Sequence, residues 1–463
     1  MKKVLFIDSL DKIEVDTLIL CHKQLQEEID QKLKRSISYN LQRFSLPLWI
    51  TTNGEYPIPR LVFVDEKDDL SSFAIDSRVA IASDNIPSEK LAFELLKKNP
   101  LAETLVFLCA HPKQAEARFQ KYQHLLQSIF FAKEMIAAPA NLMTPMRVAN
   151  RCRLLERQGV IVEVLDEEQL KRINADALLA VGKGSPNTPK MVIMEYRGSK
   201  DSPIALVGKG ICYDSGGINL KNSHLVEMKW DKAGSGAVIG VMDVLSRLNA
   251  AVHVVGVIVL AENMPDGNAL KPGDVISSLG GKSIEIIDTD CEGRLALADG
   301  IAYVQKYFLP KVLIDLGTLT LETFGALGSE YAGLFCNDAI LAKKLIQAGN
   351  ATGEKLWRLP LGEYYANQMH SKIADLKNSG VLRYGASSAA AEFLRAFVDP
   401  QIHWAHIDIS GTAWKVDAPE EGVTAFGVQL IAEYILNQVS DSLFLNRDSF
   451  FENFFSAKDG NII

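Results

Sequence analysis

The 463-residue sequence has no long hydrophobic run and no recognisable export segment. None of its apolar stretches approaches the roughly 20 residues that a membrane-spanning helix needs. Near the N-terminus, the apolar run Val4–Ile7 is too short for the core of a signal peptide, and the charged residue Asp8 follows it at once. We therefore expect a soluble chain without an export signal.

Cysteine and histidine are also scarce. The six cysteines are scattered without a C-x-x-C pair, which indicates reduced thiols and a cytoplasmic protein. The eight histidines form no H-E-x-x-H motif and no G-x-S-x-G motif occurs, so neither a histidine-zinc peptidase nor a serine hydrolase of that type is supported. A net charge of −8 argues against a strong general affinity for nucleic acid. Neither a membrane nor nucleic acid is therefore the expected partner.

The length and the alternation of short apolar runs with amphipathic segments predict a two-domain α/β protein, because single cores stop growing at roughly 250–300 residues. We expect a smaller N-terminal α/β domain at 1–113, a linker helix at 114–136, and a larger C-terminal domain at 137–463 with a central mixed sheet flanked by helices. In the larger domain the expected strands are 161–164, 191–196, 204–207, 254–260, 284–287, 312–314 and 404–409, and the expected helices are 235–248, 295–308 and 388–397. Near the C-terminus, Phe450, Phe451, Phe454 and Phe455 predict a helix whose aromatic face packs on its own domain or on another subunit.

A glycine-rich polar segment follows one of the expected strands. The segment Val207–Lys221 carries Lys209, Asp214 and Lys221 among glycines that allow the backbone to turn sharply and approach a ligand. We expect these three side chains to project from a loop. A phosphate-binding P-loop is disfavoured, because neither lysine is followed by Ser or Thr.

A second polar segment, Asp288–Arg294, holds three alternating acids, Asp288, Asp290 and Glu292. On an extended segment they would face one side together, and clustered carboxylates repel unless a cation joins them. A solvated acidic loop is the alternative, but Asp231 adds another acid before a helix of small residues. Hard oxygen ligands in this number suit divalent ions such as Zn, Mn or Mg.

With these motifs the chain resembles the cytosolic leucyl aminopeptidases, a family of dinuclear metallo-aminopeptidases. The family's N-T-D-A-E-G-R signature appears here as Asp288–Arg294, and its V-G-K-G-x-x-x-D-x-G-G-x-x-x-K segment is complete from Val207 to Lys221. Leu356–Pro360 and Trp404–Ile409 are further similar segments. The resemblance extends from residue 137 to about residue 435, which is nearly the whole larger domain.

The resemblance implies an aminopeptidase that uses two divalent metal ions, Mn or Zn, to release N-terminal residues, with leucine favoured, from peptides. It implies these ligands: Asp214, Asp290 and Glu292 for one ion, and Lys209, Asp214, Asp231 and Glu292 for the other. Lys221 would stabilise the developing oxyanion and Arg294 would hold a bicarbonate that shuttles a proton. The substrate pocket would include Met228, Thr318 and Leu319, and the chain would assemble as a homohexamer.

Two positions depart from the family pattern. Asp288 stands where the family has asparagine, which predicts either a stronger preference for basic or polar N-terminal residues or a shifted metal preference. Leu321 replaces a glycine, which changes the fit on the leaving-group side. Two other functions stay open at this point: a two-metal phosphoesterase, and a DNA-binding or architectural protein that retains the peptidase fold.

Overall fold

The computed structural model describes residues 3–7, 17–20, 48–51, 60–63, 78–82, 87–97, 104–108, 111–380, 384–415, 422–439 and Leu443. The chain divides into two compact units, Met1–Leu126 and Gln127–Ile463. The division falls within helix α3, Pro112–Ala137, and the domain boundaries expected at 113/114 and 136/137 stay predictions. The phenylalanine stripe at 450–455 lies outside the described residues. Among the described helices, none combines the length and the apolar character needed to cross a bilayer.

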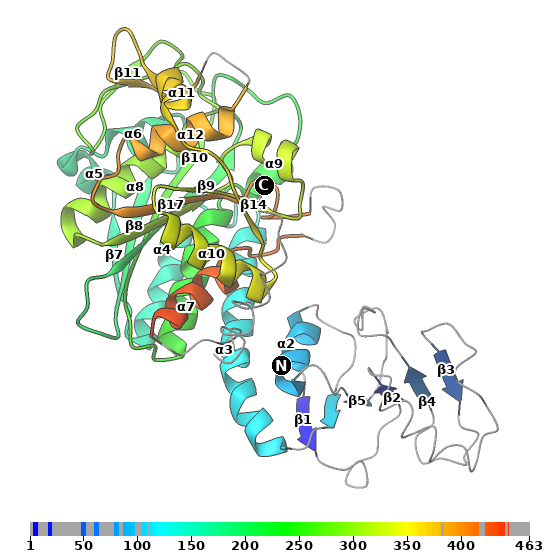
Figure 1. The fold of residues 1–463 in the computed structure, drawn as a ribbon. Coiled ribbons are helices and arrows are strands. Elements are labelled where there is room, and N and C mark those ends of the chain that lie inside the picture. The colour runs from blue at the N-terminus through cyan, green and yellow to red at the C-terminus, as the bar shows by residue number, and fades with distance from the viewer. Residues whose placement is uncertain are drawn as a thin grey trace, which may run out of the picture. The chain divides into compact units, whose positions relative to one another are not determined.

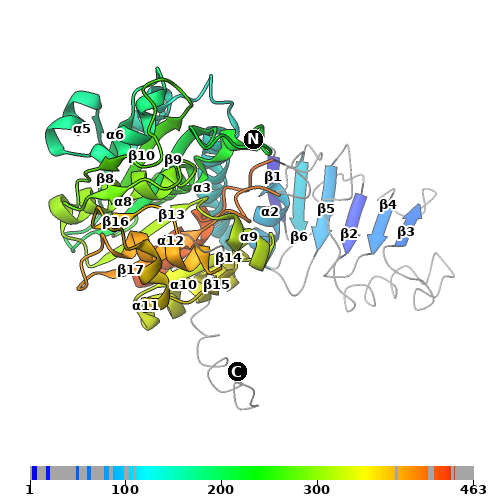
Figure 2. The same cartoon turned by 90° about the horizontal axis from the view of Figure 1, so that it is seen from above.

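The first unit contains a six-stranded sheet in the order β1-β6-β5-β2-β4-β3, seen with its strands side by side in Figure 2. Its strands are β1 (Lys3–Ile7), β2 (Thr17–Leu20), β3 (Leu48–Thr51), β4 (Arg60–Phe63), β5 (Arg78–Ala82) and β6 (Thr104–Leu108). All neighbours are parallel except β3 and β4. Helix α2, Ser88–Lys97, buries its apolar residues, as its amphipathic sequence predicts.

The second unit is built on an eight-stranded mixed sheet in the order β15-β14-β17-β13-β9-β10-β8-β7. Its strands are β7 (Ile161–Leu165), β8 (Lys190–Arg197), β9 (Ile204–Asp214), β10 (His253–Asn263), β13 (Val312–Gly317), β14 (Ala332–Cys336), β15 (Leu356–Arg358) and β17 (His403–Asp408). A small sheet holds β11 (Val275–Ile276), β12 (Ile284–Glu285) and β16 (Leu376–Lys377). The four central strands β17, β13, β9 and β10 are mutually parallel, so their carboxyl ends meet at one edge of the sheet.

Helices cover both faces of this sheet, as Figure 1 shows. The α-helices of the unit after α3 are α4 (Pro145–Cys152), α5 (Glu167–Ile173), α6 (Asp176–Val181), α7 (Ala233–Arg247), α8 (Glu292–Phe308), α9 (Leu321–Leu327), α10 (Ala339–Thr352), α11 (Glu363–Ala366), α12 (Ala386–Arg395) and α13 (Val428–Gln438). Successive residues of β9 show the layering, because Val207 contacts Gly300 of α8 whereas Gly208 faces Gly234 of α7. The expected α/β class with a mixed sheet flanked by helices is confirmed.

Two local expectations were wrong. Lys209 and Asp214 were expected in a loop, but β9 continues to Asp214, because parallel neighbours on both sides supply its backbone hydrogen bonds. The acids of the second polar segment were expected on one side of an extended chain, but residues 288–291 form a turn, closed by a hydrogen bond from Cys291 N to Asp288 O, and Glu292 begins α8. The acids therefore reach the site from a turn and a helix.

Candidate active site

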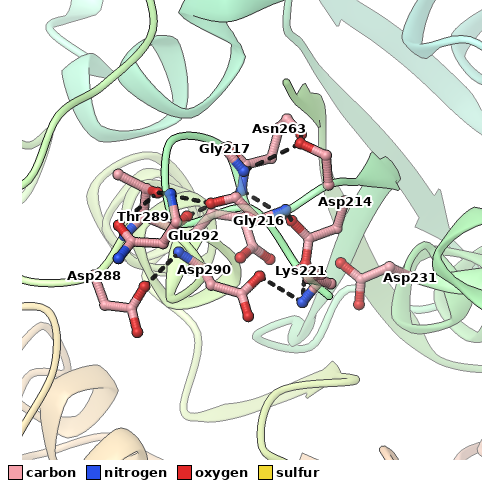
Figure 3. Close-up of polar contacts among 12 residues, drawn as sticks. Asp214, Gly216, Gly217, Lys221, Asp231, Asn263, Asp288, Thr289, Asp290 and Glu292 are labelled. Carbon is pink, nitrogen blue, oxygen red and sulfur yellow. Dashed lines mark hydrogen bonds and ion pairs between the residues drawn. The ribbon is translucent and has the colours of Figure 1, made fainter. Parts of the chain in front are cut away.

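Four buried or partly buried carboxylates converge at the carboxyl edge of the central strands. Asp214 is the last residue of β9, Asp290 lies in the turn before α8, and Glu292 is the first residue of that helix. Each of these three offers a carboxylate oxygen within 4.8 Å of the others, and Figure 3 shows them gathered around one space. Asp231, just before α7, is the fourth. The geometry thus brings together acids that lie up to 78 positions apart in the sequence, between 214 and 292.

Lys209 lies inside this acidic cluster and is only 3% exposed. Its Nζ is 2.9 Å from Asp231 Oδ1 and 3.0 Å from Glu292 Oε1, and it donates a hydrogen bond of 2.7 Å to Thr318 O. Burial lowers the pKa of Lys209, but the charges of the surrounding carboxylates outweigh it and raise that pKa above its ordinary value. Lys209, Asp231 and Glu292 therefore form a second set of adjacent donor atoms, which shares Glu292 with the triad of Asp214, Asp290 and Glu292.

Lys221 approaches the triad from the loop after β9. Its Nζ is 2.8 Å from Asp214 Oδ2 and 2.5 Å from Asp290 Oδ1, as the dashed lines in Figure 3 mark. Burial disfavours the charged amine, yet the nearby carboxylates raise the pKa of Lys221 overall. The ammonium is thus held at the edge of the cluster, where it also lines a cavity.

The carboxylates are poorly satisfied by the protein itself. Burial raises the pKa of Asp231 and of Glu292, and it raises that of Asp290 to about 7, with mutual repulsion adding to the effect. Within the described part of the chain, Asp231 Oδ2 and Glu292 Oε2 are buried and accept no hydrogen bond. Buried oxygens of this kind cost free energy unless a partner is supplied. The donor set therefore fits divalent cations, which prefer carboxylate oxygens and neutral nitrogen.

A hydrogen-bonded brace joins the two polar segments beneath the cluster. Asn263, the last residue of β10, donates from Nδ2 to Asp214 Oδ1 (2.8 Å) and to Thr289 O (2.9 Å). The Thr289 hydroxyl donates to Gly216 O (2.6 Å) and accepts from Asn219 N (2.8 Å). These bonds fix the orientation of the Asp214 carboxylate relative to the turn that carries Asp290.

Gly217 makes the brace possible. Its φ of +70° lies in the left-handed region, and a Cβ there would be 2.7 Å from Asn263 Oδ1. A side chain would therefore be strained by its own backbone and would push Asn263 away from Asp214.

Arg294 and Asp288 lie close to the cluster without joining it. Arg294 donates from Nη1 to Asn378 O (2.7 Å), while its Nε is buried and has no partner among the described residues. Asp288 accepts a hydrogen bond from Asp290 N (2.9 Å) at Oδ1, and the Asn378 amide donates to Asp288 O (2.6 Å). Asn378 thus connects the arginine to the acidic turn.

A cavity of about 680 Å³ opens beside these groups. Nine of the ten predicted site residues line it: Lys209, Asp214, Lys221, Met228, Asp231, Asp290, Arg294, Thr318 and Leu319. The tenth, Glu292, is not part of the cavity wall, although it contacts Lys209. Asp288 and Leu321 also line the cavity, and Leu321 is 78% exposed. All the candidate residues therefore belong to one site.

Several residues of the site were not singled out from the sequence. Asn263 follows a buried strand at its carboxyl end, a position that could have marked it. Thr289 and Gly293 lie inside the second polar segment, but they were not selected because neither residue type is a typical metal ligand or acid–base group. Asp408 lies in the similar segment Trp404–Ile409, but neither Asp408 nor Asn378 was given a role, because both act through hydrogen bonds with segments far away in the sequence.

Residues 130–432 match the family model described as the catalytic domain of the cytosol aminopeptidase family. The chain belongs to the cytosol aminopeptidase family. A "Probable cytosol aminopeptidase" of Rhodopseudomonas palustris is 45% identical over 338 residues, which are 72% of this chain and 67% of the relative. Proteins with the same description from Sinorhizobium fredii (41% over 375 residues, 79% and 73% of the two chains) and Caulobacter vibrioides (43% over 346 residues, 73% and 70%) are also similar.

Membership in the cytosol aminopeptidase family confirms the resemblance seen in the sequence and the enzyme class. The protein is a metal-dependent aminopeptidase, a hydrolase that removes N-terminal residues. The carboxylate cluster of Asp214, Asp290 and Glu292 is a group that could hold the metal.

Proposed function

We propose that this aminopeptidase binds two divalent cations, Mn or Zn, in the acidic cluster. Asp214, Asp290 and Glu292 would hold one ion, and Lys209, Asp214, Asp231 and Glu292 would hold the other. The observation that carries the proposal is the set of buried carboxylate oxygens that no protein donor reaches among the described residues. The triad on one side and the contacts of Lys209 on the other support two adjoining sites, which would share Asp214 and Glu292.

The bound cations would polarise the scissile carbonyl, activate a water and ligate the free α-amine of the substrate. Lys209 would take part as the neutral amine, because adjacent dications would lower its pKa and so oppose the carboxylates, which raise it. Lys221 would remain protonated and donate a hydrogen bond to the oxyanion that develops on the carbonyl. Its position beside Asp214 and Asp290 supports this role.

Arg294 would hold a bicarbonate that shuttles a proton. Its guanidinium is fixed through Nη1 by Asn378 O, and its buried Nε, which has no partner among the described residues, would be available for an anion. An anion that accepts from Arg294 would sit at the wall of the cavity and could carry a proton between water and the leaving amine.

The substrate side chain would occupy the part of the cavity near Met228, Thr318 and Leu319, with leucine favoured. Two apolar side chains and a threonine suit a branched aliphatic residue. Asp288 adds an acidic group to the cavity wall and supports acceptance of basic or polar N-terminal residues as well. Leu321 would narrow the space available to the leaving peptide.

The names of the relatives support a cytoplasmic location, and we propose a homohexamer as the assembly. Neither the family description nor the relatives' names support a DNA-binding or architectural role or a phosphoesterase. A family of peptide hydrolases together with an amine ligand in the cluster favours peptides as substrates.

The deciding experiment is steady-state hydrolysis of leucine p-nitroanilide by protein stripped of metal and then supplied with Mn or Zn. We expect activity to return with metal and to vanish when the substrate amine is acetylated. An Asp290→Asn variant should lose metal and activity, whereas the exposed control Asp201→Asn should keep both. Absence of turnover with either metal, in protein that binds two ions per chain, would contradict the proposal.

A further inference from the structure

One wall of the cavity is a short loop between β13 and α9. Thr318, Leu319 and Thr320 form the loop, and Leu321 begins α9; all four line the cavity. The loop therefore meets any substrate that reaches the cluster, and its position determines the shape of that wall.

The first residue of the loop is tied to the acidic cluster. Thr318 O accepts the hydrogen bond from Lys209 Nζ, and the Thr318 hydroxyl donates to Asp231 Oδ1 at 2.6 Å. Thr318 thus keeps its place through the cluster itself. The next residues need another support, because they extend away from the strand.

That support comes from Asp408, the last residue of β17. Asp408 pairs in register with Gly317 of β13 and with Gly333 of β14, so its carboxylate lies beside the point where β13 gives way to the loop. Gly333 leaves room for the approach of α9, since a Cβ there would be 2.8 Å from Thr323 Cγ2. Asp408 is buried, with 1% of its surface exposed to solvent.

The Asp408 carboxylate accepts five hydrogen bonds. Oδ1 accepts from Leu319 N (3.1 Å), from Ser410 N (3.2 Å) and from the Ser410 hydroxyl (2.6 Å). Oδ2 accepts from the hydroxyls of Thr320 (2.6 Å) and Thr323 (2.8 Å). Ser410 in turn accepts from Thr320 N through its Oγ (3.1 Å). Leu319, Thr320 and Thr323 are thereby linked, directly or through Ser410, to one carboxylate.

We propose that Asp408 is the positioning residue of the loop between β13 and α9: by holding Leu319, Thr320 and Thr323 through both carboxylate oxygens, it sets the cavity wall against which the substrate binds. The inference rests on the proposed function, since it assigns the support of that function's binding site. None of the hydrogen bonds to Asp408 given above comes from a proposed metal ligand, and Asp408 is not part of the cavity wall. It therefore acts through the loop.

Only a carboxylate meets all the donors at this position. An asparagine keeps one accepting oxygen, but its amide nitrogen donates and would face the hydroxyls of Thr320 and Thr323. These hydroxyls would have to turn away and accept instead, which loosens the loop without leaving a cavity in the core. Thr318 keeps its own bonds to the cluster in such a variant, so substrate binding and metal binding are separable.

The test compares Asp408→Asn and Thr320→Val with two matched controls. Asp299→Asn changes an equally buried carboxylate that accepts backbone N–H groups of Leu178 and Leu279, and Thr352→Val removes a buried hydroxyl that donates to Ala348 O. KM and kcat for leucine p-nitroanilide, metal content, and binding of leucine by calorimetry are measured for each protein.

We expect Asp408→Asn to raise KM by about tenfold, with kcat within about threefold of wild type and metal content unchanged, because ground-state binding is what the loop supplies. Thr320→Val should change KM in the same direction, and the controls should leave KM unaltered even where they lower the melting temperature.

Unchanged KM and unchanged leucine binding in both test variants would overturn the inference. So would a loss of metal with normal KM, which would mean that Asp408 acts on the cluster. If Asp408→Asn fails to fold, Thr320→Val decides by the same criteria. If the wild-type protein is inactive, the proposed function is wrong. The inference about Asp408 is then decided by comparing leucine binding between the wild type and the two test variants.

Discussion

Gly293 offers a sharp test of the acidic cluster, because the Lys209 side chain passes directly over it. A Cβ at residue 293 would be 2.4 Å from Lys209 Cε, 2.6 Å from Nζ and 2.7 Å from Cδ. Carbon atoms in contact prefer about 3.5–4.0 Å, so Gly293→Ala requires Lys209 to retreat by roughly 1 Å. The retreat would break or lengthen the contacts of Nζ with Asp231, Glu292 and Thr318.

The stability effect of Gly293→Ala should be small compared with the effect on activity. Overpacking costs about 1–3 kcal/mol, while alanine in place of glycine in a helix returns about 1 kcal/mol. The net loss in unfolding free energy is thus about 0–2 kcal/mol. A displacement of roughly 1 Å in a group that organises the reacting centre can cost about 100-fold in rate, so we expect kcat/KM to fall at least that far.

The assay combines kcat/KM for leucine p-nitroanilide, ions bound per chain by mass spectrometry, and urea denaturation. Gly300→Ala is the control in the same helix, because its Cβ would meet Val207 Cγ1 at 2.8 Å and so overpack the core without touching Lys209. Gly325→Ala in α9 is the open control, because apart from its chain neighbours and the nearby helix backbone no atom would lie within 4 Å of its Cβ. Near-normal activity with two ions bound in Gly293→Ala would refute the reasoning that Lys209 must stay in place.

Three further predictions concern single side chains. Lys221→Met removes the ammonium that lies 2.8 Å from Asp214 Oδ2. We expect kcat/KM to fall by a factor of roughly 10²–10³ while the metal content stays the same. Retained activity in steady-state assays would exclude an oxyanion role for Lys221. Asp288→Asn keeps the acceptor for Asp290 N but removes a charge from the cavity, so the ratio of kcat/KM for arginine over leucine p-nitroanilide should drop, and an unchanged ratio with either metal removes the specificity hypothesis. Burial raises the pKa of Asp299 to about 7. The folded chain therefore keeps a proton on Asp299 that the unfolded chain loses from about pH 4 upward. As a result, the contribution of Asp299 to the free energy of unfolding declines as the pH rises to 7. The stability advantage of wild type over Asp299→Asn in urea titrations should therefore shrink from pH 4 to pH 7, whereas an advantage that grows would mean that the hydrogen bonds from Leu178 and Leu279 dominate.

The positions of most strands of the larger unit followed from local patterns, but among its described helices after α3 only α7, α8 and α12 were expected. Apolar runs such as 254–260 and 312–314 lie inside β10 and β13, and the helical pattern of 295–308 lies inside α8. Buried central strands read as continuous apolar runs, which the sequence displays directly. The ends of these elements were less predictable, because Lys209 and Asp214 extend β9 through pairing with neighbouring strands rather than through their own propensities.

The sequence by itself determined the chemistry of this protein: the acids and lysines of two short motifs, together with Asp231, indicate a divalent-metal site, and the resemblance of these motifs to a known family identifies an aminopeptidase. Only the tertiary structure decided how these groups are held. Asn263, Asn378 and Asp408 reach the site from strand ends and a loop, and they make hydrogen bonds with partners 26 to 91 residues away in the chain. Such bonds depend on which strands are neighbours in the sheet and on their register. The polar residues at the strand ends carry no local signal of their partners, because each partner belongs to a strand or turn that only the folded sheet brings alongside.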